Sequence, residues 1–351
     1  MEKVLMKGNE AIGAAAIKAG CRYFFGYPIT PQNEVPEYMA KELPKHGGVF
    51  LQAESEVAAI NMVYGAAGAG ARVMTSSSSP GLALKQEGLT YIAACELPCL
   101  VVNVVRGGPG LGGIQPAQSD YYQATRGGGN GDYKLIVLAP ASLQELTDMV
   151  QEAFDLADYY RNPVMVLADG MIGQMMEPVA FGEIPQWTLP EKNWATTGTD
   201  GDRAPNVINS LFLAPEELEA LNIRLQAKYQ TIKANETRCE IYQLEDAEIV
   251  FTAYGTTARI VKNAIKILKA EGIKAGLIRP MTLWPFPEAA YQALPKTVKC
   301  ILSVEMSCGQ MVDDVRLAVE SKVPVAFYGR SGGMIPTVDD IVAEAKQLLG
   351  R

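Results

Sequence analysis

The sequence predicts an α/β protein with two doubly wound domains, and three observations lead to this prediction. The first half of the chain alternates short apolar runs with longer helical patterns, which is typical of βαβ units and a mostly parallel sheet covered on both faces. Over residues 179–206 this periodicity lapses, and Pro, Gly, Thr and Asp dominate. A second alternation begins near Ala247. We therefore expect one domain over residues 1–178, a linker with a helix over 179–240, and a second domain over 241–351.

The expected strands of the first domain are short apolar runs that end at turn residues, as buried parallel strands do. The run at 23–27 ends in a Pro-Ile-Thr-Pro turn, and the run at 100–105 breaks into a glycine-rich loop. The segments between the strands show apolar residues at helical spacing, and the first of these helices ends at Gly20. In chain order the expected elements are a helix at 9–19, strands at 23–27 and 49–52, a helix from Glu56, a strand at 71–75, a helix at 84–95, strands at 100–105 and 135–139, a helix at 142–159 and a strand at 163–168.

The linker and the second domain follow the same logic. A polar helix is expected from Pro215 to about Ala234, ahead of the second alternation of strands and helices. The elements expected after it are strands at 248–253 and 274–278 with a helix at 258–270 between them, a strand at 300–304, a helix at 311–321 and a final strand at 324–328.

Composition and charge argue against several classes of protein. The formal net charge of −8 argues against nucleic-acid or anionic-membrane binding, which needs basic patches. No apolar run has the length of a membrane span, and the N-terminus lacks the apolar core of a secretory signal, so we expect a cytoplasmic location. The six cysteines form no Cys-x-x-Cys pair, so we expect reduced thiols and no metal site. His46, the only histidine, lies in a turn-like segment, which argues against histidine-dependent catalysis.

Glu56 is the first candidate for chemistry. It follows Ser55, a good helix N-cap, and opens a helix that is nearly apolar all round and is therefore expected to be buried. A carboxylate carried to the edge of a buried interior is costly unless something pairs with it. The alternative is a structural role, because a glutamate in the first turn of a helix also complements the helix dipole.

Three further candidates lie at predicted strand ends. Arg106 follows the strand at 100–105, where an arginine can bind a carboxylate with two parallel hydrogen bonds. Thr30 lies in the rigid turn after the strand at 23–27, and Thr75 precedes a serine run. A sheet-edge salt bridge and ordinary turn chemistry are the structural alternatives for these residues. If the strands are parallel, all three side chains converge with Glu56 at one edge of the sheet.

The loop at 108–113 matches the Gly-x-Gly-x-x-Gly pattern and so invites a dinucleotide-binding interpretation. Its context is poor, because Pro109 lies inside the turn and Pro116 interrupts the helix that should follow. A flexible strand-end loop, or a loop that lets backbone approach a ligand, is the alternative.

The chain resembles the alpha subunit of 2-oxoacid:ferredoxin oxidoreductases. The motifs that carry the resemblance occur in order along nearly the whole chain, and the loop from Gly107 to Asp120 is most similar to the 2-oxoisovalerate (3-methyl-2-oxobutanoate, branched-chain) type. In the first half they are GYPITP at 26–31, QAESEVAA at 52–59, TSSSSPG at 75–81, RGGP at 106–109 and QSD at 118–120; in the second half they are YGTTAR at 254–259, RPMTLWPFP at 279–287 and VEMSCGQMV at 304–312.

The resemblance implies a thiamine-diphosphate pyrimidine-binding domain followed by a transketolase C-terminal-like domain. It implies that Glu56 is catalytic and bonds the N1′ atom of the cofactor, that Thr30 and Thr75 also contact the cofactor, and that Arg106 and Thr30 bind the substrate. The chain has no Gly-Asp-Gly string, the usual diphosphate and magnesium motif. This absence agrees with the family pattern, in which partner subunits supply Mg²⁺ and the iron–sulfur clusters.

The implied activity is oxidative decarboxylation of a 2-oxoacid to acyl-coenzyme A and CO₂, with the electrons passing to ferredoxin. The implied partner chains are beta and gamma subunits, and a ferredoxin-like subunit is a further candidate. The implied reaction partners are ferredoxin, a 2-oxoacid and coenzyme A. The alternatives are the same reaction on pyruvate, 2-oxoglutarate or another 2-oxoacid, a nucleotide-dependent dehydrogenase, and a non-catalytic assembly subunit.

Overall fold

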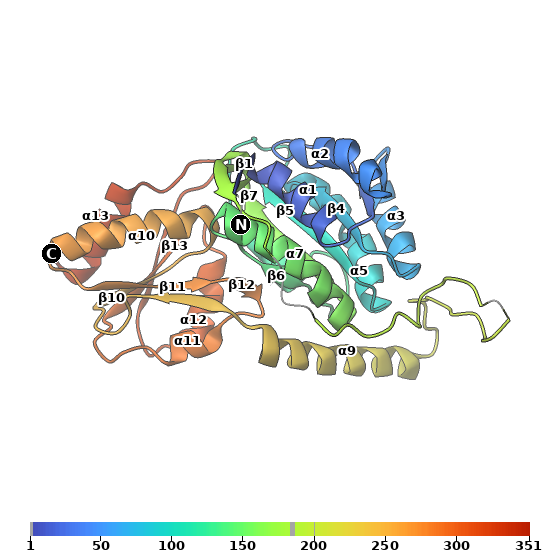
Figure 1. Ribbon diagram of the computed structural model, residues 1–351. Coiled ribbons are helices and arrows are strands. Elements are labelled where there is room, and N and C mark those ends of the chain that lie inside the picture. The colour runs from blue at the N-terminus through green and yellow to red at the C-terminus, as the bar shows by residue number, and fades with distance from the viewer. Residues whose placement is uncertain (1–2, 183–186, 200) are drawn as a thin grey trace.

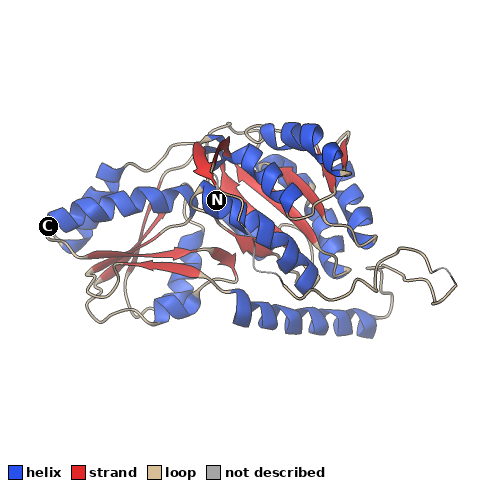
Figure 2. Cartoon of the chain, in the orientation of Figure 1, coloured by secondary structure: helices blue, strands red, loops and turns tan. Residues whose placement is uncertain are grey.

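The computed structural model describes residues 3–182, 187–199 and 201–351, which form two α/β units around separate sheets (Figure 1). The larger unit contains a seven-stranded sheet and the smaller unit a five-stranded sheet. Helices cover both sheets (Figure 2). The two doubly wound units predicted from the sequence are confirmed.

The strands of the seven-stranded sheet are in the order β12-β6-β7-β5-β4-β2-β3. All its neighbouring strands are parallel except β12, which pairs antiparallel with β6. β12 lies late in the chain, so the second half of the sequence completes the sheet of the first half. The strands are β2 (Tyr23–Gly26), β3 (Val49–Gln52), β4 (Val73–Ser77), β5 (Cys99–Val105), β6 (Ile136–Leu138), β7 (Pro163–Asp169) and β12 (Thr282–Trp284).

Two helix groups pack on this sheet. One group joins α1 to α2 and α7, and the other joins α3 to α5. A two-stranded antiparallel ribbon of β1 (Val4–Lys7) and β8 (Met176–Val179) lies beside them. The helices are α1 (Gly8–Lys18), α2 (Glu34–Glu42), η1 (Leu43–His46), α3 (Glu56–Gly68), α4 (Ser79–Leu84), α5 (Gln86–Ala94), α6 (Tyr121–Arg126), α7 (Leu143–Tyr160) and α8 (Gly170–Gln174).

The predicted linker helix is α9 (Pro215–Glu236), which runs along the lower side of the larger unit in Figure 1. It is polar but buries one stripe of side chains against that unit: Leu221, Leu225, Tyr229 and Ile232. α9 thus leads the chain back along the first unit before the second sheet begins.

The five-stranded sheet has the order β14-β13-β10-β11-β9, and only β9 is antiparallel to its neighbour. Figure 1 shows α10 and α13 on one side of it and α11 and α12 on the other. The elements are β9 (Cys239–Tyr242), β10 (Ile249–Thr252), α10 (Gly255–Ala270), β11 (Ala275–Pro280), α11 (Glu288–Gln292), β13 (Cys300–Glu305), α12 (Met311–Val319), β14 (Val325–Gly329) and α13 (Val338–Leu349).

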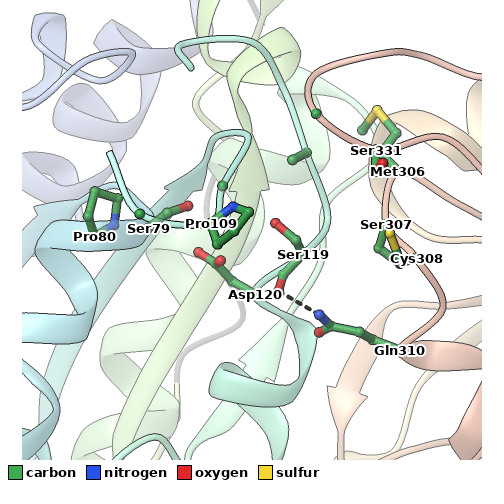
Figure 3. Close-up of a pocket in the computed structure, with 14 residues that line it drawn as sticks. Ser79, Pro80, Pro109, Ser119, Asp120, Met306, Ser307, Cys308, Gln310 and Ser331 are labelled. Carbon is green, nitrogen blue, oxygen red and sulfur yellow. Dashed lines mark hydrogen bonds between the residues drawn. The ribbon is translucent and has the colours of Figure 1, made fainter. Parts of the chain in front are cut away.

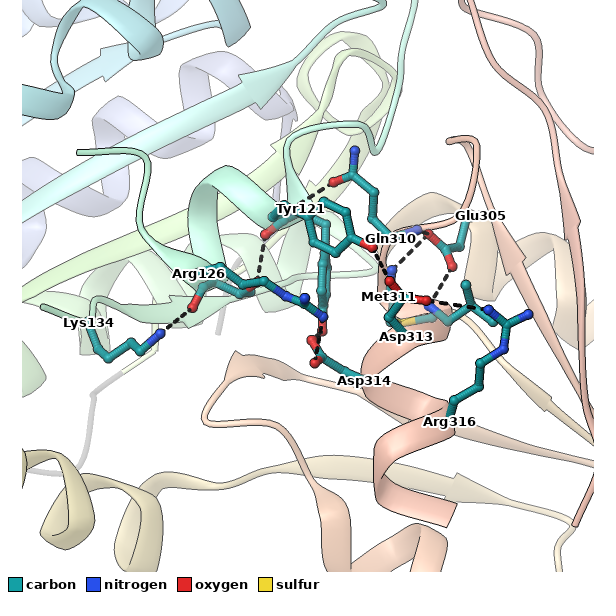
Figure 4. A network of polar contacts seen from close by, with 12 residues as sticks. Tyr121, Arg126, Lys134, Glu305, Gln310, Met311, Asp313, Asp314 and Arg316 are labelled. Atoms are coloured by element: carbon teal, nitrogen blue, oxygen red, sulfur yellow. Dashed lines mark hydrogen bonds and ion pairs between the residues drawn. The ribbon is translucent and has the colours of Figure 1, made fainter. Parts of the chain in front are cut away.

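Polar contacts fix the two units against each other. The Gln118 side chain donates to the Tyr254 carbonyl at 2.9 Å and accepts from the Thr257 hydroxyl at 2.7 Å and the Met306 N–H at 3.0 Å. Figure 4 shows a second set of contacts, in which the Tyr121 hydroxyl donates to Asp314 at 2.6 Å. Burial next to that carboxylate raises the pKa of Tyr121 well above its usual value, so the phenol stays protonated.

The structure corrects three predictions near the candidate site. α3 is not buried on all sides in this chain, because the side that faces away from β2, β4 and α5 is uncovered and leaves Val57 44% exposed. The strand expected at 71–75 is β4 (Val73–Ser77), so the first serines of the run belong to the strand, and Ser79 begins α4. Lys85 separates α4 from α5, so the single helix expected at 84–95 begins at Gln86.

No helix within the described residues has the length and apolar character needed to cross a membrane.

Candidate active site

The candidate residues lie around the carboxyl ends of three neighbouring parallel strands. β2, β4 and β5 are adjacent in the larger sheet. Thr30 follows the end of β2, Thr75 lies within β4, and Arg106 directly follows β5. In open α/β sheets, ligands bind at this edge. The predicted parallel arrangement is therefore present, but the prediction that Thr75 lies at a strand end is wrong, because β4 continues to Ser77.

Glu56 is the first residue of α3 and is 7% exposed. Ser55 caps the helix as predicted, since its hydroxyl accepts from the Ala58 N–H at 3.2 Å. In the part of the chain that the structure describes, no hydrogen bond or ion pair reaches the Glu56 carboxylate. The residue is nearly buried as a whole while its carboxylate oxygens are left free to accept hydrogen bonds from a ligand.

The wall beside Glu56 is formed by Gly81 in α4. A Cβ atom at residue 81 would lie 2.6 Å from Glu56 Oε1 and 2.3 Å from Ser77 Oγ, so a side chain cannot be accommodated without movement. The hydroxyls of Ser77 and Ser78 are buried and have no hydrogen-bond partner in the described residues. The Glu56 carboxylate and these two serine hydroxyls are thus left free for a bound polar group.

Arg106 and Thr30 are in contact. The Arg106 guanidinium donates to the Thr30 carbonyl and to the Leu111 carbonyl, each at 2.9 Å, and its Nε is buried without a partner. Arg106 is 7% exposed, and no carboxylate among the described residues lies within ion-pair distance of it. A buried arginine with spare donors and no counter-ion is suited to bind an anion.

Thr75 is fully buried, and its hydroxyl accepts from Lys85 Nζ at 2.7 Å. Sequence reasoning missed Lys85, which is also fully buried and donates to the Ser76 carbonyl at 3.0 Å. Burial lowers the pKa of Lys85 from 10.5 to about 7, and the negative charge of Glu56 acts in the opposite direction. The signal in the sequence is a lysine at 85 between the apolar runs of α4 and α5.

A cleft of about 430 Å³ opens between the two units next to these strand ends. Figure 3 shows Ser79 and Asp120 of the larger unit facing Ser307 and Cys308 of the smaller unit across it. Burial raises the pKa of Asp120, whereas hydrogen bonds from Asn103, at 2.9 Å, and from Ser79 oppose this rise. Thr30 borders a separate cavity of about 500 Å³.

The glycine-rich loop after β5 does not have a dinucleotide-binding context. Its backbone folds back on itself, with Gly113 N–H donating to the Gly107 carbonyl at 2.8 Å and Arg106 bridging to Pro116. The next helix, α6, begins only at Tyr121, so the glycines do not open a helix at the strand end. The loop instead supplies a carbonyl to Arg106.

Comparison with known families decides what this arrangement is. The family model "Pyruvate flavodoxin/ferredoxin oxidoreductase, thiamine diP-bdg" matches residues 14–236, more than half of the chain. The model "Pyruvate:ferredoxin oxidoreductase core domain II" matches residues 247–341. The chain belongs to the 2-oxoacid:ferredoxin oxidoreductase family. The family relationship predicted from the motifs is confirmed, as is the pairing of a thiamine-diphosphate pyrimidine-type unit with a transketolase C-terminal-like unit.

Several relatives of this oxidoreductase subunit are similar over their full length. Ketoisovalerate oxidoreductase subunit VorB of Methanothermobacter marburgensis is 47% identical over 100% of this chain and 99% of the relative. 2-Oxoglutarate synthase subunit KorA of Archaeoglobus fulgidus is 39% identical over 94% of this chain and 95% of the relative. These names describe subunits, so the oxidoreductase is a complex of several chains.

Two solved structures are similar to this oxidoreductase subunit. The 2-oxoglutarate:ferredoxin oxidoreductase from Magnetococcus marinus, with 2-oxoglutarate, coenzyme A and succinyl-CoA bound, has a TM-score of 0.89 and 32% identity. The match covers 99% of this chain and 65% of that chain. A split-gene transketolase has a TM-score of 0.62 at 15% identity, which reflects the fold alone.

The residues around Glu56 fit the pyrimidine half of thiamine diphosphate, the cofactor of the matched family. The ring carries nitrogens and an amino group, and the site offers a carboxylate that accepts no hydrogen bond from the described residues and the unpartnered Ser77 hydroxyl beside it. No group of three or more His, Cys, Asp or Glu side chains in the described residues is arranged to hold a metal ion.

Proposed function

We propose that this chain is the alpha subunit of a thiamine-diphosphate-dependent oxidoreductase that decarboxylates 2-oxoisovalerate to an acyl-coenzyme A and CO₂. The observation that carries the proposal is the Glu56 carboxylate at the start of α3, which accepts no hydrogen bond from the described residues and lies beside the unpartnered Ser77 hydroxyl. The 47% identity to ketoisovalerate oxidoreductase subunits supports 2-oxoisovalerate as the substrate.

Each candidate residue has a distinct role in this proposal. Glu56 holds and exchanges a proton with N1′ of the pyrimidine. Arg106 binds the substrate carboxylate with its spare donors, and Thr30 borders the substrate next to it. Thr75, which the resemblance assigned to cofactor contact, is fully buried with its hydroxyl bonded to Lys85, so we propose that it supports the pyrimidine site through Lys85. Thiamine diphosphate, when held with its pyrimidine ring at Glu56, would supply the nucleophile and the electron sink that decarboxylation of a 2-oxoacid requires.

Partner subunits complete the proposed enzyme. A beta subunit provides Mg²⁺ and the diphosphate site, iron–sulfur clusters in partner chains accept the electrons, and ferredoxin removes them. A gamma subunit completes the complex, and a ferredoxin-like subunit is a further candidate member. Exposed apolar side chains near the site, Val49 and Leu51 on edge strand β3 and Val57 on α3, support docking of another chain there.

The substitution Glu56→Gln in the assembled complex tests the catalytic role. It keeps the shape of the side chain but removes its ability to exchange a proton, so turnover should fall at least about a hundred-fold. The matched control is Glu54→Gln, which changes an exposed carboxylate two residues away. Normal turnover in the Glu56 variant would instead identify this chain as an assembly subunit.

The substrate is tested by a panel of 2-oxoacids on the complex with coenzyme A and ferredoxin. 2-Oxoisovalerate should have a higher kcat/KM than pyruvate, 2-oxoglutarate or an aryl pyruvate. A pocket discriminates by a single methylene only about 10- to 200-fold, so the ranking is more informative than the absolute values. A preference for 2-oxoglutarate would assign the chain to the other group of relatives.

A further inference from the structure

The cavity of about 500 Å³ that Thr30 borders has mainly apolar walls. Ile114 comes from the end of the glycine-rich loop, Met171 from α8 and Ile335 from the segment after β14. The other described residues that line it are prolines, a glycine and two glutamines, so none of the lining side chains carries a charge. A cavity of this kind is suited to an uncharged alkyl group.

This cavity shares two walls with Arg106. The Arg106 guanidinium donates to the Thr30 carbonyl at 2.9 Å, and the Arg106 backbone forms a bridge with Pro116. Thr30 and Pro116 both line the cavity, so the guanidinium lies beside it. The carboxylate and the alkyl group of a 2-oxoacid are attached to the same keto carbon. An acid whose carboxylate binds at Arg106 therefore has its alkyl group within reach of the cavity.

The second unit supplies the Ile335 wall through close backbone contact. The segment after β14 lies against the glycine-rich loop, where a Cβ atom at Gly107 would lie 3.2 Å from the Gly333 nitrogen. A Cβ atom at Gly333 would lie 2.5 Å from Gln115 Cβ, and its φ of +93° also favours glycine. These glycines let the two backbones approach, and the approach places the half-buried Ile335 at the cavity.

The cleft beside Ser79 offers a different environment. The Asp120 carboxylate and the hydroxyls of several serines line it (Figure 3). An alkyl group placed there would take polar groups out of water without giving them partners. Of these two cavities, the one at Thr30 is therefore the better match for an apolar side chain.

We propose that the cavity bounded by Ile114, Met171 and Ile335 binds the branched alkyl group of the 2-oxoacid, and that Ile335 is a specificity-determining residue. The proposal rests on the function proposed above, because it requires the substrate carboxylate to bind at Arg106. The isopropyl group of 2-oxoisovalerate buries apolar surface in this cavity, whereas the methyl group of pyruvate buries much less. The second carboxylate of 2-oxoglutarate finds no cation among the described residues that line it.

The test compares kcat/KM for 2-oxoisovalerate and for pyruvate in the assembled complex with coenzyme A and ferredoxin. Ile335→Ala removes part of the wall, so kcat/KM should fall about ten-fold for 2-oxoisovalerate and less than about two-fold for pyruvate. Ile335→Leu keeps the apolar volume and should restore most of the wild-type ratio. Met171→Ala, on the α8 wall, should lower the same ratio and serves as a second variant if Ile335→Ala fails to assemble.

Met334→Ala is the matched control. Met334 is the neighbour of Ile335, is 55% exposed and does not line the cavity. Its ratio of kcat/KM values should equal that of the wild type. A wall residue that only supports the fold would lower kcat/KM equally for both substrates, and an equal loss in Ile335→Ala and in Met171→Ala would refute the alkyl site.

The outcomes separate the two proposals. If Glu56→Gln abolishes turnover but the ratio is unchanged in both wall variants, the alkyl site is refuted and the function stands. If Glu56→Gln leaves turnover intact while Ile335→Ala still lowers the ratio, the catalytic role of Glu56 fails and the alkyl site stands.

Discussion

The residues of the candidate site are held by contacts that leave their reactive groups free. The Arg106 guanidinium donates to two backbone carbonyls, which fix it in place, while its Nε has no partner. Glu56 is held by its position at the start of α3, and its carboxylate stays free. Preorganised side chains of this kind lose little free energy of reorganisation when a ligand arrives.

Gly81 should be essential for the geometry of Glu56. The substitution Gly81→Ala places a methyl group 2.6 Å from Glu56 Oε1, so the carboxylate must move. A displacement of this size should lower the turnover of the complex roughly a hundred-fold. Gly65→Ala, in the same region but with open space around its added methyl group, is the control. It should leave turnover unchanged and raise the unfolding free energy by up to about 1 kcal/mol.

Lys85 should make the stability of the isolated chain depend on pH. Its pKa is about 7 in the folded chain and 10.5 in the unfolded chain, so the unfolded state binds more protons between these values. The free energy of unfolding of the wild type should therefore rise relative to Lys85→Met as the pH increases from about 7 to about 10. Denaturant titrations at several pH values measure this. A constant difference across that window would contradict the lowered pKa.

At the scale of elements, the start of α3 controls the position of Glu56. Ser55→Ala removes the N-cap hydrogen bond and should cost about 1 kcal/mol of unfolding free energy. Because Glu56 is the next residue, turnover of the complex should fall as well. Ser142→Ala removes the equivalent cap of α7 and should cost a similar free energy with no effect on turnover. Equal turnover in the two variants would show that the N-cap of α3 does not control the position of Glu56.

Elements with a strong local pattern could be predicted from the sequence. β5 and β7 are continuous apolar runs, and α7 has a serine cap with apolar residues at helical spacing. Elements that form only because another part of the fold pairs with them could not be predicted. β12 is only three residues long and exists because β6 offers it an open edge. α4 could not be predicted either, because it begins within a serine run, and such runs are typical of loops.

The same distinction applies to the candidate site. Arg106 and Thr30 could be found because parallel strands end at a common edge, and Glu56 because a carboxylate stood at the start of an apolar helix. Lys85 could not be placed, because its contacts reach back to β4 through a break between two helices. The use of Arg106 by the glycine-rich loop also depends on how that loop folds back.

At the scale of the whole molecule, Arg279 links the two units. It is almost fully buried and forms ion pairs with Glu145 of α7 at 2.7 Å and Glu240 of β9 at 2.6 Å. Arg279→Met leaves both half-buried carboxylates without this partner, although Glu240 keeps Lys262, and should cost about 1–3 kcal/mol of unfolding free energy. Lys274→Met removes an exposed pair with Asp246 and should cost less than about 1 kcal/mol. Denaturant titration distinguishes them, and equal losses would show that Arg279 does not join the units.

The pairing of β12 with β6 has a practical consequence for dividing this polypeptide. A stop codon between α9 and β9 would remove Thr282–Trp284 and bare the backbone of β6, which invites aggregation. Cleavage at residues 201–207, an exposed stretch ahead of α9, would leave every strand of both sheets with its neighbours. Two co-expressed fragments that are divided within residues 201–207 should therefore reassemble. Fragments that are divided between α9 and β9 should not.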